Sequence, residues 1–190
     1  MRKSKLEAAE TRRRIVKTAA AEFRRKGIRS TGLSDVMATA GLTHGGFYRH
    51  FASKDELVAE ACAAAMQSLD ETAEAAACRS VAKKGLEVLL TSYLSTDHRD
   101  NVANGCPLAG LGSELARSDN KTRAAATAGF LKVVDMLAKQ YRQTSPERAR
   151  ARALVAAAAM VGAVTMSRIV TDPKLSAAIL HSARKYLVRI

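Results

Sequence analysis

The sequence predicts an all-α protein of about nine helices, and three observations support this prediction. Apolar residues make up 47% of the 190 positions, yet aromatic residues make up only 4% and tryptophan is absent. Alanine, the best helix former, supplies much of the apolar content and favours close-packed helices over a sheet. The three prolines all lie where a helix can begin. The chain is long enough to bury a real hydrophobic core.

The first fifty residues contain three predicted helices. Apolar residues recur with the helical period over Lys5–Lys26, and Gly27 is a natural stop after them. We expect Thr31 to cap a short second helix that ends before Gly41. Thr43 is the expected cap of a third short helix, which ends near residue 51.

The rest of the chain reads as longer helices. The sequence Ser-Lys-Asp-Glu at positions 53–56 fits the capping-box pattern and predicts the start of a long fourth helix. The polar segment Ser95–Gly105 is the one candidate for an extended loop. Further helices are predicted near Val81–Ser95, Pro107–Ala116, Lys121–Arg142, Pro146–Val170 and Pro173–Val188.

The charge of the chain is concentrated at its N-terminal end. The whole sequence has 31 Lys or Arg against 18 Asp or Glu, a net charge of +13. Residues 1–30 hold eleven Lys or Arg against three Glu, a net charge of +8. Such a cluster is expected of a protein that binds a polyanion. A solvated basic tail is the alternative.

Several classes of protein are disfavoured. Cys62, Cys78 and Cys106 are too widely spaced for a disulfide framework or a metal-binding pair, which fits a reducing cytoplasm. The N-terminus lacks the apolar core of a signal peptide. The apolar run Leu154–Met166 is well short of the ~20 residues that span a bilayer. The four histidines are dispersed and no phosphate-binding or metal-ligand motif occurs, so we predict no enzyme, cofactor, metal site or membrane partner.

Two short helices joined by a tight glycine-containing turn are typical of helix-turn-helix DNA binding. The second of them, the recognition helix, contains Gly45 and Gly46, although each glycine costs a helix interior about 1 kcal/mol relative to alanine. A glycine on the side that faces the groove lets the backbone approach bases or phosphates closely. The alternative is that these glycines only mark a loop after Thr43.

Three local patterns over Thr11–Ala61 belong together. Ala-x-x-x-Phe-x-x-x-Gly ends the first helix at position 27, Ala-Gly forms the turn at 40–41, and Gly-x-x-Tyr-x-x-Phe-x-x-Lys runs from position 45 to 54. With these patterns the stretch resembles the N-terminal domain of the TetR family of transcriptional repressors. Thr43 replaces the serine usual in the family. Gly46 departs more, because a side chain often stands there, and specificity is then expected to shift to His44, Arg49 or the start of the second helix.

Roles in DNA binding follow from this resemblance and from the chemistry of the side chains. Tyr48 can donate to a phosphate oxygen, and Lys54 adds a charge at a helix N-terminus. Base reading is expected of His44, with Arg49 or Arg29 able to approach guanine, although an exposed surface role is the alternative for His44 and Arg49. The predicted DNA-binding residues are Thr31, Thr43, His44, Gly45, Gly46, Tyr48, Arg49 and Lys54.

The resemblance also implies a DNA-binding domain at residues 1–52 and an effector-binding and dimerisation domain at 53–190. One small reading unit makes few base contacts, so a homodimer on a palindromic double-stranded DNA operator is expected. The family implies dimerisation through the last two helices, and the stretch Ala153–Val170 is apolar around most of its circumference, so it needs neighbours on several sides. Burial of both helices within one subunit is the alternative.

The family further implies a cavity for a small-molecule effector among the middle helices. Candidate lining residues are apolar, and flexible ones among them would suit an apolar or aromatic effector. They are Met66, Tyr93, Phe130, Val134, Leu137 and Met160. The alternative for each of them is ordinary core.

Cys106 is the last of the candidate effector-site residues. It also suggests a separate function, the sensing of oxidants or electrophiles. It precedes Pro107 and so lies near a helix N-cap, where the helix dipole would lower the pKa of the thiol and favour a thiolate. The protein would then be an oxidant-sensing or electrophile-sensing repressor, whereas the alternative for Cys106 is a small buried or capping residue. A sequence-independent DNA-coating protein is the other competing function. The leading prediction is a ligand-responsive repressor.

Overall fold

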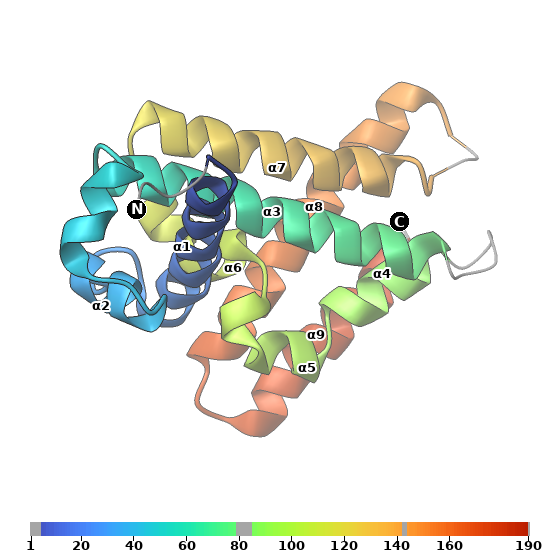
Figure 1. The fold of residues 1–190 in the computed structure, drawn as a ribbon. Coiled ribbons are helices and arrows are strands. Elements are labelled where there is room, and N and C mark those ends of the chain that lie inside the picture. The colour runs from blue at the N-terminus through green and yellow to red at the C-terminus, as the bar shows by residue number, and fades with distance from the viewer. Residues whose placement is uncertain (1–4, 79–84, 142–143, 190) are drawn as a thin grey trace.

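The computed structural model describes residues 5–78, 85–141 and 144–189, and these residues form helices and no strands (Figure 1). The all-α prediction is therefore confirmed. The α-helices are α1 (Lys5–Lys26), α2 (Leu33–Thr39), α3 (Lys54–Cys78), α4 (Gly85–Tyr93), α5 (Thr96–Asp100), α6 (Pro107–Leu115), α7 (Asn120–Ala138), α8 (Pro146–Ile169) and α9 (Pro173–Leu187). Two 3-10 helices, η1 (His44–Arg49) and η2 (Val102–Asn104), complete the fold. The predicted helix start at Val81 and helix end at Arg142 lie outside the described residues.

Local sequence determines most helix ends. Gly27 after α1 has a φ of +89° and Gly41 after α2 has a φ of +68°, backbone conformations that favour glycine. The three prolines open α6, α8 and α9, as predicted. Ser145 and Asp172 cap the last two of these helices, because their side chains accept backbone N–H groups of the first turn.

One prediction about the elements is wrong. The segment Ser95–Gly105 is not an extended loop: Ser95 caps the short helix α5 by accepting the N–H of His98, and η2 follows. The predicted third short helix, which contains the double glycine, is present and is a 3-10 helix. Its bonds include Gly46 N–H to the Thr43 carbonyl at 3.0 Å, the short-range pattern that suits a six-residue piece.

The capping box before α3 forms only in part. The Ser53 hydroxyl accepts the N–H of Glu56 at 3.1 Å, as predicted. The Glu56 carboxylate, however, accepts the N–H of Ala52 at 2.7 Å rather than that of Ser53. It also pairs with Arg12 at 2.9 Å, and the Arg12 guanidinium lies 4.0 Å from the centroid of the Phe51 ring. These contacts fix the start of α3 against α1.

The helices form two groups that share α3. In Figure 1, α1, α2 and the following turn lie at one end, and α3 runs from them alongside α7 across the molecule. Helix α8 packs against α7 and α9. In α7, Gly129 allows close packing on α3, because a Cβ there would come within 2.6 Å of the Cβ of Met66.

Two hydrophobic clusters form the core, and α6 contributes to both. The N-terminal cluster contains Ile15, Phe23, Val36, Met37, Phe47, Phe51, Leu57 and further residues up to Ala65, with Leu111, Leu115 and Ala126. The second cluster contains Leu89, Leu90, Cys106, Ala109, Val134, Leu137, Ala153, Met160, Val164 and Leu180 among others. Leu108 packs against both clusters, so α6 connects the two groups of helices through hydrophobic contacts.

Helix α8 is long and apolar enough to span a membrane by length and composition, and it is the one such helix among the described residues. Its Ala153, Ala156 and Met160 are buried in the second cluster. A core helix of a soluble protein passes the same test, so this helix alone is weak evidence for a membrane location.

Candidate functional site

In the helix-turn-helix unit, the outer side of η1 is exposed and its inner side packs on a buried hydrophobic core. Val36, Met37 and Phe47 are fully buried beneath it, and the rings of Phe47 and Phe51 stack with centroids 5.5 Å apart. On the outer side, the backbone of Gly45 and the side chains of His44, Tyr48 and Arg49 are exposed. Apolar residues of η1 and α2 therefore build the scaffold and leave the polar ones available.

The two glycines of η1 point in different directions. A Cβ placed on Gly45 would meet no atom of the described residues within 4 Å, so no contact among them requires a glycine there. A Cβ on Gly46 would face inward, 3.7 Å from the Cε of Met37 and 3.8 Å from the Oγ1 of Thr43, which is ordinary contact. A side chain at position 45 would therefore point away from the protein, whereas one at position 46 would point toward it.

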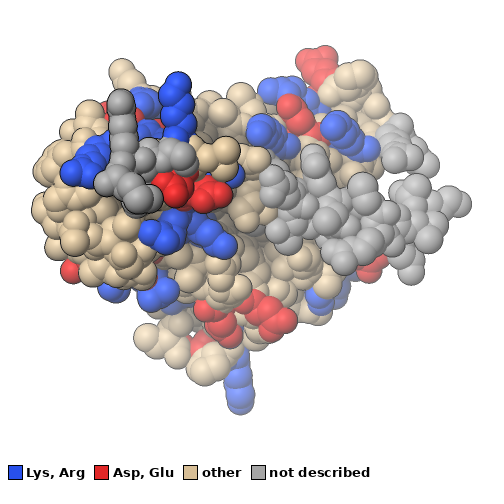
Figure 2. All heavy atoms as spheres, in the orientation of Figure 1, with Lys and Arg blue, Asp and Glu red and all other residues tan. Residues whose placement is uncertain are grey.

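Tyr48 is the most prominent side chain of this surface. It is 65% exposed, and its ring stands edge-on to Phe47 at 5.2 Å and to His44 at 6.2 Å. The Phe47 contact anchors the ring while the hydroxyl stays accessible. Figure 2 shows Lys and Arg side chains over the N-terminal helices and near the junction of α7 and α8, with others scattered along the lower part of the visible face.

The predicted roles of the two threonines are corrected. Thr31 does not cap α2: the N-cap is Gly32, and the buried Thr31 hydroxyl donates to the Gly27 carbonyl at 2.7 Å. The hydroxyl therefore fastens the turn before α2 and does not face outward. Thr43 does occupy the N-cap position of η1 and is exposed, but its side chain makes no capping hydrogen bond.

Lys54 is committed to the protein itself. Its ammonium donates to the carbonyls of Ile28 and Thr31, both at 2.7 Å, from the first residue of α3. The ammonium of Lys54 thus holds the turn at residues 27–31. This arrangement differs from the free phosphate contact that the sequence predicted.

The same turn is also held by Glu114, a residue that no sequence motif indicated. The Glu114 carboxylate accepts the backbone N–H of Ile28 at 3.0 Å and that of Arg29 at 2.9 Å. Arg24 donates to the Ala103 carbonyl at 2.7 Å beside it. Because these partners are about 80 residues apart in the chain, no local pattern could have revealed the contact.

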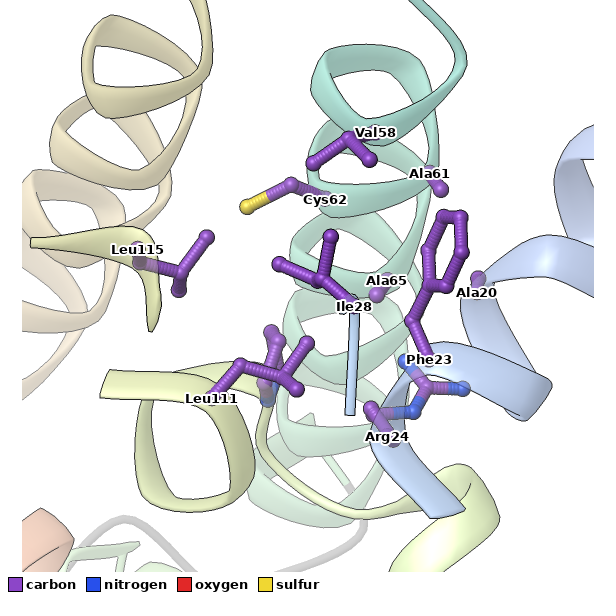
Figure 3. Close-up of a pocket in the computed structure, with 11 residues that line it drawn as sticks. Ala20, Phe23, Arg24, Ile28, Val58, Ala61, Cys62, Ala65, Leu111 and Leu115 are labelled. Atoms are coloured by element: carbon purple, nitrogen blue, oxygen red, sulfur yellow. The ribbon is translucent and has the colours of Figure 1, made fainter. Parts of the chain in front are cut away.

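Figure 3 shows the apolar side of this junction. Ile28 points between α3, where Val58 and Cys62 lie, and α6, where Leu111 and Leu115 lie. The remaining space is about 10 Å³, so the joint is nearly filled. Burial raises the pKa of Cys62 to about 11, which keeps its thiol protonated at neutral pH.

A second small cavity lies between α4, α6, α7 and α8. Its lining includes four of the predicted effector residues, Tyr93, Cys106, Phe130 and Met160. Sequence analysis missed Leu108, Val133, Ala157 and Val161, which complete it. The space amounts to about 10 Å³, room for about one water molecule.

Three predicted effector residues lie outside this cavity. Val134 and Leu137 are fully buried in the second cluster, and Met66 packs against Gly129 where α3 meets α7. Helical periodicity identified them correctly as interior residues. It could not distinguish the wall of a cavity from solid core.

The predicted low pKa of Cys106 is wrong. Cys106 does occupy the N-cap of α6, where backbone groups of the first turn and the Tyr93 hydroxyl would favour a thiolate. Burial outweighs these effects and raises the pKa of the thiol. A protonated thiol is the less reactive form.

His98 links this cavity to the end of α4. Its Nε2 accepts the backbone N–H of Cys106 at 3.0 Å, which leaves Nδ1 to donate to the Tyr93 carbonyl at 2.7 Å. Both contacts together require the neutral imidazole. Burial, opposed by the Tyr93 contact and assisted by the charge of Arg168, lowers the pKa of His98 accordingly.

The fold and this surface define a class: a helix-turn-helix transcriptional regulator. Residues 15–61 match the family model described as bacterial regulatory proteins, tetR family. Residues 82–178 match that of the C-terminal domain of LmrA/YxaF-like transcriptional regulators. The chain belongs to the TetR family. It is a DNA-binding transcriptional regulator, in a family whose members are typically ligand-responsive repressors.

Individual proteins agree with this assignment. An uncharacterized HTH-type transcriptional regulator of Mycobacterium tuberculosis is 30% identical over 176 residues, covering 85% of this chain and 86% of that protein. The probable acrEF/envCD operon repressor of Escherichia coli is 37% identical over 59 residues, 31% of this chain and 27% of the repressor. The crystal structure of a TetR-family regulator from Cytophaga hutchinsonii has a TM-score of 0.81 at 21% identity, covering 100% of this chain and 98% of that one, and so shares the fold.

Proposed function

We propose that this chain is a homodimeric repressor that binds a palindromic DNA operator and is released from it by a small-molecule effector. The observation that carries the proposal is the exposed side of η1, where Gly45 has no neighbour that a side chain would meet and Tyr48 is 65% exposed. A closed core beneath an open polar surface is what a groove-binding element needs. Residues 1–52 act as the reading domain and residues 53–190 as the effector and dimerisation domain, in the cytoplasm.

Within this proposal, the exposed residues divide into two roles. Tyr48 and Thr43 contact the phosphate backbone and fix the orientation of η1, while Lys54 supports them by holding the turn before α2. His44 and Arg49 reach base edges, because both are exposed on the same short helix. The close approach that this requires is made by the backbone at Gly45.

The proposed dimer forms through α8 and α9. Exposed apolar side chains recur at helical spacing along both helices, which supports a contact between subunits. They are Leu154, Val155, Met166 and Ile169 on α8, and Leu175 and Tyr186 on α9. Two such helices from each subunit would pack as a four-helix bundle.

Gly162 lies in the middle of the proposed interface on α8. It is exposed in the middle of α8, and a Cβ there would meet no atom within 4 Å of its own subunit. A glycine in a helix interior costs about 1 kcal/mol relative to alanine, and no contact within the described part of the subunit requires a glycine here. Close approach of the partner subunit's helix explains it.

Helix α6 is the proposed link between effector and DNA. Its first turn, with Cys106 and Leu108, forms part of the cavity wall, and Glu114 near its other end holds the turn that precedes α2. Since the empty cavity has room for only about one water molecule, an effector has to displace its walls. A shift of α6 would then move the reading domain relative to the dimer.

Sensing through Cys106 is the alternative mode of release. The position of Cys106 in the cavity wall supports contact with an electrophile that enters there. The raised pKa of its thiol argues against rapid reaction. Release of operator DNA by peroxide or a quinone in the native protein, and its loss in Cys106→Ser, would favour this mode over reversible effector binding.

The test of the main proposal is selection of bound duplexes from a random-sequence pool by the full chain. We expect an enriched palindrome that binds two chains per duplex and resists unrelated competitor DNA. Recovery without enrichment would contradict the proposal and indicate sequence-independent coating. One chain per selected duplex would contradict the homodimer.

A further inference from the structure

The imidazole of His98, on α5, is the acceptor on which the start of α6 depends. Its Nε2 accepts the backbone N–H of Cys106, the N-cap residue of α6, at 3.0 Å. Its Nδ1 donates to the Tyr93 carbonyl at 2.7 Å, and the rings of Tyr93 and His98 lie with centroids 4.5 Å apart. Both ring nitrogens are therefore engaged, and the neutral ring ties the end of α4 to the start of α6.

Arg168 of α8 brings a positive charge to the same place. Its Nη2 donates to the His98 carbonyl at 3.0 Å, and its Nε donates to the Arg99 carbonyl at 2.9 Å. A Cβ placed on Gly105 would come within 2.9 Å of Arg168 Nη2 and 3.3 Å of His98 Nε2. The two nitrogens thus lie close to one point of the chain. The Nη1 of Arg168 is buried and has no hydrogen-bond partner among the described residues.

The other charged groups around His98 would not offset a proton on its ring. On α5, Asp97 is exposed, and the exposed Asp100 is paired with Arg99 at 2.7 Å. From α1, Arg24 adds further positive charge by donating to a carbonyl of η2 at 2.7 Å. The described neighbours therefore offer no unpaired carboxylate that contacts the ring.

The remaining two titratable neighbours are uncharged. Burial raises the pKa of the Tyr93 hydroxyl and that of the Cys106 thiol, so both stay protonated at neutral pH. The charge that acts on His98 is that of Arg168, which adds to the effect of burial in lowering the pKa of the imidazole.

Protonation of His98 would break the contact with α6. A protonated imidazole carries an N–H at both nitrogens, so Nε2 would face the N–H of Cys106 as a second donor. The new charge would also lie beside Arg168 and near the positive end of the α6 dipole. An arrangement in which the ring reaches water and the start of α6 has moved would bind the proton better.

Helix α6 carries such a movement to the DNA-binding unit. Leu111 and Leu115 are buried in the N-terminal cluster. The Glu114 carboxylate holds the N–H groups of Ile28 and Arg29 in the turn before α2. Because α6 has only nine residues, a displacement at its first turn also displaces its last turn.

We propose that His98 is a pH-dependent switch of operator binding: the neutral imidazole holds α6 in the DNA-binding arrangement, and protonation releases the operator. The inference rests on the proposed function for the existence of an operator. It goes further in naming a signal, an acid shift, that acts without a ligand in the cavity.

The expected size of the effect follows from proton linkage. In the released arrangement the ring is solvated and has the ordinary pKa of about 6.5, so at about pH 5.5 roughly ten of eleven rings are protonated. DNA binding must then expel this proton, which weakens operator binding by about 10-fold for each subunit.

The first test compares native protein and His98→Gln on the selected operator. Fluorescence anisotropy at constant salt gives both dissociation constants at about pH 7.5 and about pH 5.5, and we expect the ratio of native to variant to rise by about 10-fold or more. His44 and His50 gain charge in the same range and strengthen DNA binding, but both proteins contain them. His181→Gln, on the exposed side of α9, is the control and should behave as the native protein does.

The second test uses only the native protein. The ring signals of His98 are recognised in NMR spectra by their contact with the Tyr93 ring. Because linkage is reciprocal, the pKa of His98 should be lower in the operator complex than in the free protein. This measurement decides the question even if His98→Gln does not fold.

An equal pKa of His98 in the free and bound protein would overturn the inference. An unchanged ratio of dissociation constants would also overturn it, as would loss of the helical circular dichroism of the native protein at the lower pH, because release would then be unfolding. Failure to select any operator at about pH 7.5 would instead contradict the proposed function. Operator binding with no dependence on His98 would leave the proposed function intact.

Discussion

The carboxylate of Glu114 accepts the backbone N–H of Arg29 at 2.9 Å, a contact between the last turn of α6 and the turn that precedes α2. Its other oxygen accepts the N–H of Ile28, and the Lys54 ammonium holds the carbonyl of the same residue. The turn is thus fixed by one negative and one positive side chain. Helix α6 also contributes Leu108 to the wall of the second cavity, so a displacement of α6 by the proposed effector would act directly on this turn.

Glu114→Gln should loosen this junction. Glutamine has one carbonyl oxygen and an NH₂ group that cannot accept the second N–H, and the charge that strengthens both bonds is lost. We expect the free energy of unfolding in urea to fall by about 1–2 kcal/mol. We also expect a bound effector to weaken operator binding less than in the native protein.

Glu87→Gln is the matched control, because Glu87 is exposed on α4. This variant should keep both the native stability and the native response. If Glu114→Gln releases DNA at the same effector concentration as the native chain, the junction does not carry the coupling.

Substitutions at the two glycines of η1 should have opposite results. Gly45→Val adds a side chain where the protein has no atom within 4 Å, so the fold and the dimer should be preserved. Operator affinity, measured by fluorescence anisotropy, should fall by about 10-fold or more, because the backbone can no longer approach the duplex. Gly46→Ala points toward Met37 at an ordinary distance and should bind nearly as the native protein does. Retained affinity in Gly45→Val would refute the close-approach argument.

Features that depend on neighbours in the chain were predictable. The bounds of α1, the glycine stops at 27 and 41, and the proline starts of three helices all follow from capping and backbone conformation. The exposed residues of η1 also followed from a local motif. The short length and double glycine of η1 nevertheless produced a 3-10 helix, because only a few i→i+3 bonds form between two fixed turns.

Features that depend on contacts across the chain were not predictable. Thr31 and Lys54 have side chains that commonly contact phosphates at a protein surface. In this structure, however, both donate hydrogen bonds to backbone carbonyls of the turn at residues 27–31. Cys106 has the position of an activated thiol, but burial reverses the direction of its pKa shift. Glu114 acts through partners more than 80 residues away. Each outcome is decided by tertiary packing.

The proposed dimer interface can be tested at Gly162 without harming the subunit. Gly162→Gln places a side chain in open space within its own subunit and should raise intrinsic helix stability by about 0.5–1 kcal/mol. We expect the dimer dissociation constant, measured by analytical ultracentrifugation, to rise by about 10-fold or more, since the partner's helix can no longer pack closely.

Gly112 provides a control with the same chemistry. It is an exposed glycine in α6, and a Cβ there also meets no atom within 4 Å. Gly112→Gln should leave the dimer intact. Equal dissociation constants for Gly162→Gln and the native chain would indicate that the subunits associate through another face.

Stability should decrease as the pH falls through the range in which histidine titrates, and His98 should account for part of this decrease. Folding lowers the pKa of His98 below its ordinary value of 6.5, chiefly by burial of the ring. In addition, a protonated ring could not accept the N–H of Cys106. The unfolded chain then binds more protons than the folded chain, so the free energy of unfolding is highest above about pH 6.5 and declines below it. Urea unfolding at several pH values should show a shallower decline for His98→Gln, which retains one donor and one acceptor for Tyr93 and Cys106 but does not titrate. The exposed His181→Gln should follow the native curve, and a His98→Gln curve parallel to the native one would contradict this assignment.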